Sequence, residues 1–195
     1  MDSTNLREAL RDYIKKFIHL SEEEFELLCD LFSYRKLKKR EHLIKAQERC
    51  DRIIFTANGY FRFYHWNDKG IEITSDFYFA PSFITSYTSF LIGEPSLVNV
   101  QAMESMEVLE ISKSDLEKLY VKSRNIETLA RKLAEMIAIN SERHLFLLLG
   151  QTAETRYKEL MEKHPQYIQS IPLQYIASYL GITKESLSRI RKSIH

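Results

Sequence analysis

The pattern near the end of the chain, "YIASYLGITKESLSRI" over residues 175–190, constrains the fold more than any other feature. Ile176 and Leu180 are apolar one helical turn apart, and Gly181 can take the left-handed conformation that ends a helix. Thr183 is a natural N-cap for a second helix. Two short helices joined by a glycine turn are typical of a helix-turn-helix.

The second helix carries a face of polar and charged side chains suited to DNA. They are Thr183, Lys184, Glu185, Ser188, Arg189, Arg191 and Lys192. Arginine donates two hydrogen bonds to guanine, glutamate accepts one from cytosine, and lysine reaches guanine or a phosphate. The chain has a formal net charge of only +1, so a DNA-binding signal has to be local, as it is here. The alternatives are a solvated basic helix and a helix pair that docks a protein partner.

Residues 125–150, "NIETLARKLAEMIAINSERHLFLLLG", contain no proline and no glycine before Gly150 and predict one long helix. Residues on one stripe follow the three-and-four spacing of a coiled-coil seam. The residues predicted to pair two subunits are Ile126, Leu129, Leu133, Met136, Ile137, Asn140 and Leu147. Two recognition helices one DNA turn apart (~34 Å) read a pseudo-palindrome. A homodimer formed through this long helix would provide two such helices. The alternative is a core helix within a monomer.

Residues 34–111 show the alternation and turn signals of short strands, whereas residues 5–32 and 112–150 have helical spacing. The stretch "IIFTANGYFRFYHW" predicts two strands paired through a type I′ turn at Asn58-Gly59, and "NDKG" at 67–70 predicts a second turn. A Ser21–Glu24 capping box predicts a helix start. The fold class is therefore α+β, with an N-terminal β-roll (jelly roll) over 1–120, a dimerisation helix over 121–150 and a helix-turn-helix over 151–195.

This order of parts resembles the superfamily of the cyclic-AMP receptor protein and the fumarate–nitrate regulator, the Crp/Fnr regulators. The segments "LKKREHLIKAQERCDRIIFTANGYFRFYHWNDKGIEIT" and "IASYLGITKESLSRIRK" carry the resemblance. It implies a bacterial transcription regulator that acts as a homodimer on promoter DNA and has a cyclic nucleotide-binding-like domain. By motif position, Lys184, Glu185 and Arg189 match the base-contacting residues of these regulators.

The resemblance breaks down at the cyclic-nucleotide site. Members that bind a cyclic nucleotide hold the ribose with a Gly-Glu pair and the phosphate with an Arg-Ser or Arg-Thr pair, and these positions fall here on Thr85-Ser86 and Ser96-Leu97. Serine cannot replace the charge-assisted bonds of arginine. We therefore expect a regulator that does not depend on cyclic AMP, has no cofactor and has an unknown effector, if any. A pocket for another small molecule, as opposed to plain core, would be rimmed by Ser86, Tyr87, Ser89 and Ser96.

Other function classes find little support. The six histidines are scattered without metal-ligand spacing, and neither a nucleophile motif nor a phosphate-cradling glycine loop occurs, so we expect no catalytic residues and no metal site. Cys29 and Cys50 are too few to hold an iron–sulfur cluster. The charged start has no apolar signal segment, and "LFLLL" at 145–149 is too short to span a bilayer, which favours a cytoplasmic protein without a membrane partner.

The segment "SYRKLKKREHLIK" over residues 33–45 is also basic. One interpretation is a second contact, with DNA or with RNA polymerase. The other is a solvated edge strand whose lysines prevent association with other strands. The second interpretation is favoured.

Overall fold

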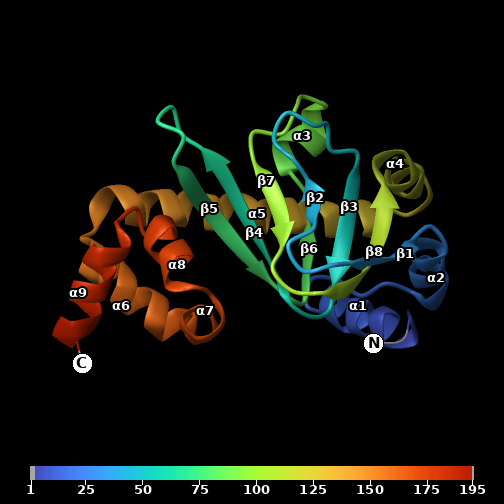
Figure 1. Cartoon of the computed structure of the whole chain (residues 1–195). Coiled ribbons are helices and arrows are strands. Elements are labelled where there is room, and N and C mark those ends of the chain that lie inside the picture. Colours follow the sequence, from blue (N-terminus) through green and yellow to red (C-terminus); the bar gives the residue numbers. More distant parts are fainter. Residues whose placement is uncertain (1–2, 195) are drawn as a thin grey trace. The chain divides into compact units, whose positions relative to one another are not determined.

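The computed structural model describes residues 3–194 (Figure 1). The chain divides into two compact units. Unit 1 consists of Met1–Phe63 and Phe77–Glu135, and unit 2 of Tyr64–Asp76 and Met136–His195. The domain limits expected at residues 120 and 150 separate a sensor domain, a dimerisation helix and a DNA-binding domain. This division by function stays a prediction.

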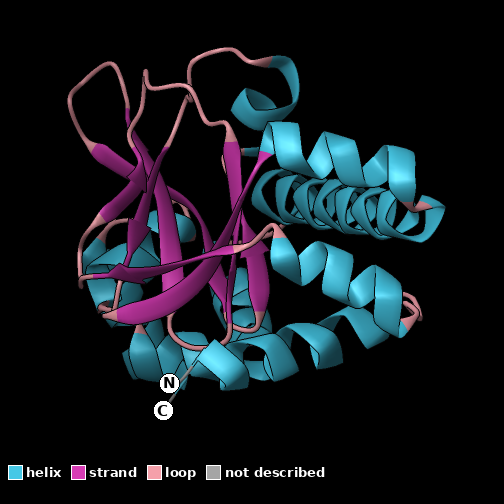
Figure 2. Ribbon diagram, turned by 90° about the vertical axis from the view of Figure 1, so that its right-hand side faces the viewer, coloured by secondary structure: helices cyan, strands magenta, loops and turns pink. Residues whose placement is uncertain are grey.

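Two four-stranded sheets form the β-roll, in the orders β1-β8-β3-β6 and β2-β7-β4-β5. The strands are β1 (Ser33–Leu37), β2 (His42–Ile44), β3 (Arg52–Thr56), β4 (Tyr60–Trp66), β5 (Glu72–Phe79), β6 (Ser82–Ile84), β7 (Asn99–Ala102) and β8 (Met106–Ser112). The helices of this part of the chain are α1 (Ser3–Lys15), α2 (Glu22–Asp30), α3 (Tyr87–Ile92), α4 (Lys113–Lys122) and the first half of α5 (Arg124–Gly150). Figure 2 distinguishes the strands from the helices. The α+β class and the β-roll are confirmed.

Capping side chains fix the helix starts of unit 1. The Glu24 N–H donates to Ser21 Oγ at 3.2 Å and the Ser21 N–H donates to Glu24 Oε2 at 2.9 Å, which is the predicted capping box. Glu24 Oε1 also accepts a 2.7 Å bond from the hydroxyl of Ser123, just before α5. Hydrogen bonds from the Ser123 hydroxyl and the Ser21 backbone hold the pKa of Glu24 below its usual value. One ionised carboxylate therefore joins the beginnings of α2 and α5.

The prediction of a hairpin at Asn58-Gly59 is wrong, although the strands on both sides exist. β3 and β4 belong to different sheets, so the chain turns a corner of the roll between them. Gly59 has φ +73°, and a Cβ at this position would lie only 2.7 Å from Met106 Cε. The glycine is needed because the backbone takes a left-handed conformation in close contact with β8. Local sequence signals a turn but not which sheet the next strand joins.

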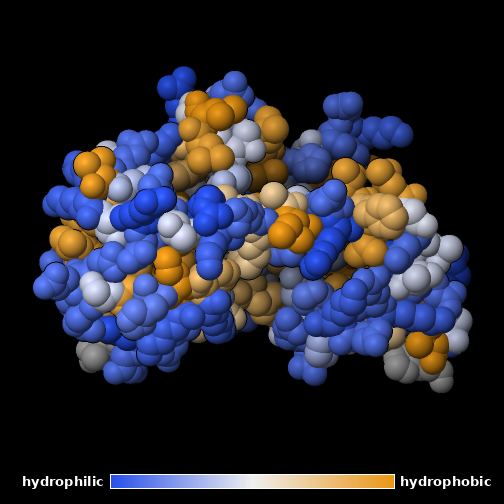
Figure 3. Space-filling model, turned by 180° about the vertical axis from the view of Figure 1, so that it is seen from behind, coloured by the Kyte–Doolittle hydropathy of each residue, from blue (hydrophilic) through white to orange (hydrophobic). Residues whose placement is uncertain are grey.

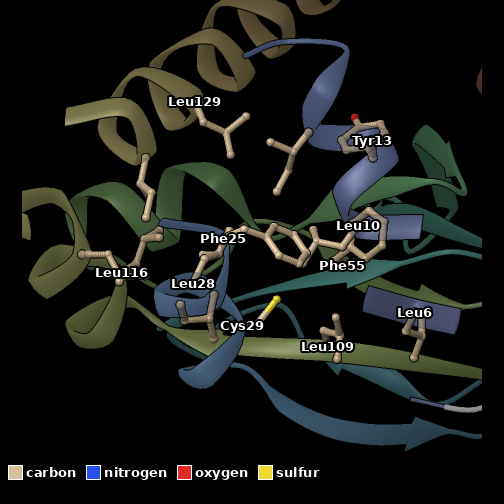
Figure 4. Packing of buried hydrophobic residues seen from close by; sticks show 14 of the residues in the cluster. Leu6, Leu10, Tyr13, Phe25, Leu28, Cys29, Phe55, Leu109, Leu116 and Leu129 are labelled. Carbon is tan, nitrogen blue, oxygen red and sulfur yellow. The ribbon is translucent and has the colours of Figure 1, made fainter. Parts of the chain in front are cut away.

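Two apolar clusters form the core of unit 1, and β8 separates them. Met106 and Val108 face the cluster between the sheets, whereas Leu109 and Ile111 face the cluster under the helices. The second cluster includes Leu10 of α1, Phe25 of α2 and Phe55 of β3, whose side chains gather in Figure 4. Strand β8 has buried apolar side chains on both faces, and Glu107 and Glu110 lie between them in its sequence.

Unit 2 contains the second half of α5, the helices α6 (Ala153–Lys163), α7 (Pro165–Ser170), α8 (Leu173–Tyr179) and α9 (Lys184–Ile194), and residues Tyr64–Asp76. We call this last segment the hairpin tip. Its turn is the predicted one, because Asn67 Oδ1 accepts from the N–H groups of Lys69 and Ile71 at 3.0 Å each and Gly70 has φ +70°. The helices bury Tyr157, Leu160, Tyr167, Ile171, Ile176, Ala177, Leu180 and Leu187.

Candidate nucleic-acid interface

The turn between α8 and α9 has the predicted geometry. The Gly181 N–H donates to Ser178 O and the Ile182 N–H donates to Ala177 O, both at 3.0 Å. These two bonds, with Gly181 at φ +69°, form a Schellman motif at the end of α8. The Ser186 N–H then donates to Thr183 Oγ1 at 3.2 Å, so Thr183 is the N-cap of α9.

The inner face of α9 is fixed by packing. Leu187 is completely buried, and Ile176, Ala177 and Leu180 of the preceding segment are buried with it. Ile190, one helical turn after Leu187, is half-buried. Because one face of the helix is anchored in this way, the opposite face has a defined direction.

Most of the predicted DNA-binding residues are exposed to solvent. Thr183, Lys184, Glu185, Arg189, Arg191 and Lys192 are exposed, and Ser188 is half-buried. Arg189 Nη2 donates to Ser186 Oγ at 3.1 Å, which holds the guanidinium along the helix. In the part of the chain that the structure describes, the four cations of this set form no salt bridge. Their charge is therefore available to an external anion.

Glu185 occupies the first turn of α9. The pKa of Glu185 is lowered by its own backbone N–H, then by the Thr183 hydroxyl, and further by the positive charges of Lys184 and Arg189. The side chain is fully exposed and ionised at neutral pH. An ionised carboxylate is the acceptor that a cytosine amino group requires.

Arg156 of α6 holds the helices of unit 2 together. Its Nη1 donates to Gln151 O at 2.5 Å and its Nη2 donates to Leu180 O at 2.7 Å. These carbonyls follow the ends of α5 and α8, where helical C=O groups have no partner within their own helix. The guanidinium thus acts as a cap for two helices.

His144 of α5 stacks on Tyr179 of α8, with ring centroids 4.6 Å apart and an interplanar angle of 22°. Burial, and then the positive charge of Arg156, lower the pKa of His144 below its ordinary value of 6.5. The unfolded chain therefore binds a proton at a higher pH than the folded chain does. It follows that acidification through and below the ordinary pKa of histidine destabilises unit 2, and that this loss is absent above it.

We expect His144→Phe to reduce this acid sensitivity. Phenylalanine can keep the stack on Tyr179 but does not titrate. Between about pH 8 and about pH 5, the melting temperature of the variant should fall less than that of the parent chain. The measurement is thermal unfolding at both pH values. His164, whose pKa burial also lowers, is common to both proteins and cancels in the comparison. Equal falls in the two proteins would contradict the assignment.

The predicted pairing residues of α5 lie in different environments. Ile126 and Leu129 are only 1% and 4% exposed, in the core of unit 1 beside the half-buried Leu133. In this conformation those three side chains contact their own chain and do not form an outer surface. Met136, Ile137 and Leu147 are half-buried, and Asn140 is exposed.

Sequence reasoning missed the most exposed apolar side chains of α5. Ile139 is 47%, Leu145 56%, Phe146 73% and Leu149 80% exposed. Ile139, Phe146 and Leu149 follow a stripe beside the predicted one, with the charged Glu142 at the remaining position of the three-and-four spacing, and Leu145 lies one turn before Leu149. In Figure 3 exposed apolar side chains form groups on an otherwise polar surface. Contiguous exposed apolar residues of this kind mark an interaction surface.

The predicted effector-pocket residues are mostly buried and bonded to one another. Ser86 Oγ lies 2.7 Å from Ser96 Oγ, and Ser96 also donates to Val98 O at 2.7 Å. Ser89 accepts from the Cys50 N–H at 2.9 Å and donates to Glu94 O at 2.5 Å. Tyr87, the fourth predicted rim residue, is half-buried.

This arrangement does not fit a cyclic phosphate. Ser86, Ser89 and Ser96 are 4%, 1% and 1% exposed, and their hydroxyl groups already take part in internal hydrogen bonds. Thr85, at the position expected for the glycine of the ribose-binding pair, donates to Arg52 O at 2.9 Å. A phosphate would have to displace these bonds, and no predicted rim residue carries a positive charge to compensate.

The basic segment 33–45 is partly neutralised within unit 1. Arg35 forms salt bridges with Glu41 and Glu110, and Lys36 forms one with Glu107. Within residues 3–194, no helix is long and apolar enough to cross a membrane. Over the same residues, no cluster of histidine, cysteine and acidic side chains could hold a metal ion.

Comparisons with known proteins agree with this architecture. Residues 34–123 match the model of the cyclic nucleotide-binding domain. No curated protein sequence matches the chain.

Several solved structures share the fold at low sequence identity. FixK2 from Bradyrhizobium japonicum is 21% identical, with a TM-score of 0.70 over 84% of each chain. CLP of Xanthomonas campestris, described as a c-di-GMP responsive global regulator, is 16% identical, with a TM-score of 0.70 over 89% of this chain and 91% of that one. A Crp/Fnr family regulator from Eubacterium rectale is 16% identical, with a TM-score of 0.69 over 89% of this chain and 83% of that one.

Residues 34–123 thus match the cyclic nucleotide-binding domain model, and they are followed by a long helix and a helical unit that ends in a helix-turn-helix. The fold is similar to that of these regulators, which confirms the predicted resemblance to the Crp/Fnr regulators at the level of the fold.

Proposed function

We propose that the protein is a homodimeric, sequence-specific DNA-binding transcription regulator that does not depend on cyclic AMP. The observation that carries the proposal is the outer face of α9. Its cations are exposed and form no salt bridge in the described chain, while the buried Leu187 fixes the direction of the helix. Lys184, Glu185 and Arg189 would read base edges, and Thr183, Ser188, Arg191 and Lys192 would contribute phosphate or groove contacts.

The exposed apolar stripe of α5 supports the dimer. Ile139, Leu145, Phe146 and Leu149 would otherwise remain in water. Ile139, Phe146 and Leu149 fall on one side of the helix, interrupted by Glu142, and this side suits a parallel helix of a second copy. Pairing along this stripe moves the proposed seam toward the C-terminal half of α5. Met136, Ile137 and Leu147 would flank it, and the exposed Asn140 would be a polar position near its centre.

The closed hydroxyl network of Ser86 and Ser96 supports independence from cyclic AMP. The sites of Crp/Fnr relatives that bind a cyclic nucleotide need charged partners, and here those positions carry neutral side chains. As a regulator of promoters the protein would act in the bacterial cytoplasm, with RNA polymerase as a further partner.

The test is a titration of genomic DNA fragments with the full chain at two salt concentrations. We expect one class of pseudo-palindromic fragments to bind far more tightly than the rest, and binding to weaken steeply as salt rises, because each phosphate contact releases counterions. Cyclic AMP should leave the affinity unchanged. Binding that is equally weak for all fragments would refute the proposal and favour the alternative, in which the terminal helices dock a protein.

A further inference from the structure

The hydroxyl of Ser178 joins α8 to the edge of strand β5 inside unit 2. The Ser178 hydroxyl accepts from the Thr74 N–H at 2.8 Å and donates a longer bond to Glu72 O at 3.4 Å. β5 is the last strand of its sheet, so the outer backbone groups of the strand are not used by a neighbouring strand. The C=O of Glu72 and the N–H of Thr74 are two residues apart and point the same way, as a sheet partner would require. Ser178 takes the place of that partner.

The contact is partly buried and does not serve the helix itself. Thr74 is only 3% exposed, and a backbone N–H at such a position needs an acceptor. Serine is a weaker helix former than alanine, so α8 gains nothing in its own stability from a serine at position 178. The role of the side chain therefore lies in the bond to the hairpin tip.

The two residues that follow Ser178 hold the helix from other directions. Tyr179 stacks on His144 of α5, with ring centroids 4.6 Å apart, and Leu180 O accepts from Arg156 of α6 at 2.7 Å. The next residue, Gly181, begins the tight turn into α9. Ser178, Tyr179 and Leu180 thus fix the position of α8. Because the turn between the helices is short, the position of α8 also restricts that of α9.

We propose that Ser178 is a positioning residue that binds the helix-turn-helix to the hairpin tip. The hairpin tip thereby helps to hold α8 and α9 in the orientation that binds DNA. For its effect on DNA this inference rests on the proposed function. Strands β4 and β5 run from unit 1 into unit 2, so the hairpin tip and the helices α8 and α9 belong to the same compact unit. Without the bond, α8 and α9 sample more orientations, and DNA has to select among them.

The experiment compares Ser178→Ala with the parent chain, and Ser178→Thr serves as the matched control that keeps a hydroxyl. In the free full-length protein, hydrogen exchange at the Thr74 amide should become about tenfold faster in Ser178→Ala and stay near the parent rate in Ser178→Thr. Amides of β8 should keep their protection in both variants, which shows that the fold is intact. The affinity of Ser178→Ala for the best genomic fragment should fall about threefold to tenfold and return with threonine.

The two readouts separate the inference from the proposed function. An unchanged Thr74 exchange rate in Ser178→Ala overturns the inference whatever the DNA result. Faster exchange with unchanged DNA affinity overturns the positioning role. If the parent chain shows no sequence preference for DNA, the proposed function fails, and the exchange data alone then decide whether Ser178 fastens the hairpin tip to α8.

Discussion

Arg189→Ala should abolish most of the preference for one DNA sequence while leaving weak, general DNA binding almost unchanged. Arg189 is exposed on α9 and its guanidinium is held by the Ser186 hydroxyl, so it can present two parallel donors to a guanine. A bidentate contact of this kind contributes about 1–3 kcal/mol of discrimination in each protomer. We expect the ratio of operator affinity to scrambled-DNA affinity to fall by about 10-fold to 100-fold or more. Competition binding with the two DNAs measures this ratio.

Arg191→Ala is the matched control for this experiment. Arg191 is also exposed on α9, two residues further along the same helix, and is assigned to phosphate contact. Its loss should reduce the affinity for operator DNA and for scrambled DNA by similar factors, and it should make the affinity less dependent on salt. If Arg189→Ala kept the full preference, or if Arg191→Ala lost as much of it, the assignment of the reading face would be wrong.

Phe146→Asp should convert the protein to monomers and reduce its affinity for a full pseudo-palindrome by about 100-fold or more. Phe146 is 73% exposed in the single chain, so the substitution leaves the fold of one protomer intact. In the proposed dimer the same position is covered by the second copy, where a carboxylate would lose its water without gaining a partner. Light scattering measures the change in mass. The change in affinity is measured by a binding titration with the operator that was found for the parent chain.

Val121→Asp controls for the placement of a charge on an exposed apolar residue. Val121 of α4 is 90% exposed and lies outside the proposed pairing stripe. This variant should remain dimeric and bind the operator like the parent chain. A dimeric Phe146→Asp variant would show that two copies do not pair through this stripe of α5.

The helix-turn-helix was predictable because its determinants are local. The end of α8, the glycine turn and the Thr183 cap each depend on bonds within a few residues, and all of them occur as the pattern indicates. The Ser21 capping box and the turn at Asn67 were predictable for the same reason. Local chemistry leaves the backbone few alternatives at such positions.

The features that sequence reasoning missed depend on tertiary contacts. The turn at Asn58-Gly59 joins strands of different sheets, which only the assembled roll decides. The spacing along α5 fits several neighbouring stripes, and it does not reveal that Ile126 is used by the core while Phe146 is left exposed. Ser178 reads as an ordinary polar residue until the edge of β5 is placed beside it.

The mutual bonding of Ser86 and Ser96 also limits how this domain could acquire a ligand. An arginine introduced at position 96 would enter a space that is 1% exposed, where its charge would face hydroxyl groups already committed to one another and to nearby carbonyls. One substitution would thus create a buried cation before any phosphate arrived to neutralise it. Evolution or engineering toward nucleotide sensing would first have to loosen the loop around Ser96 and only then add the charge.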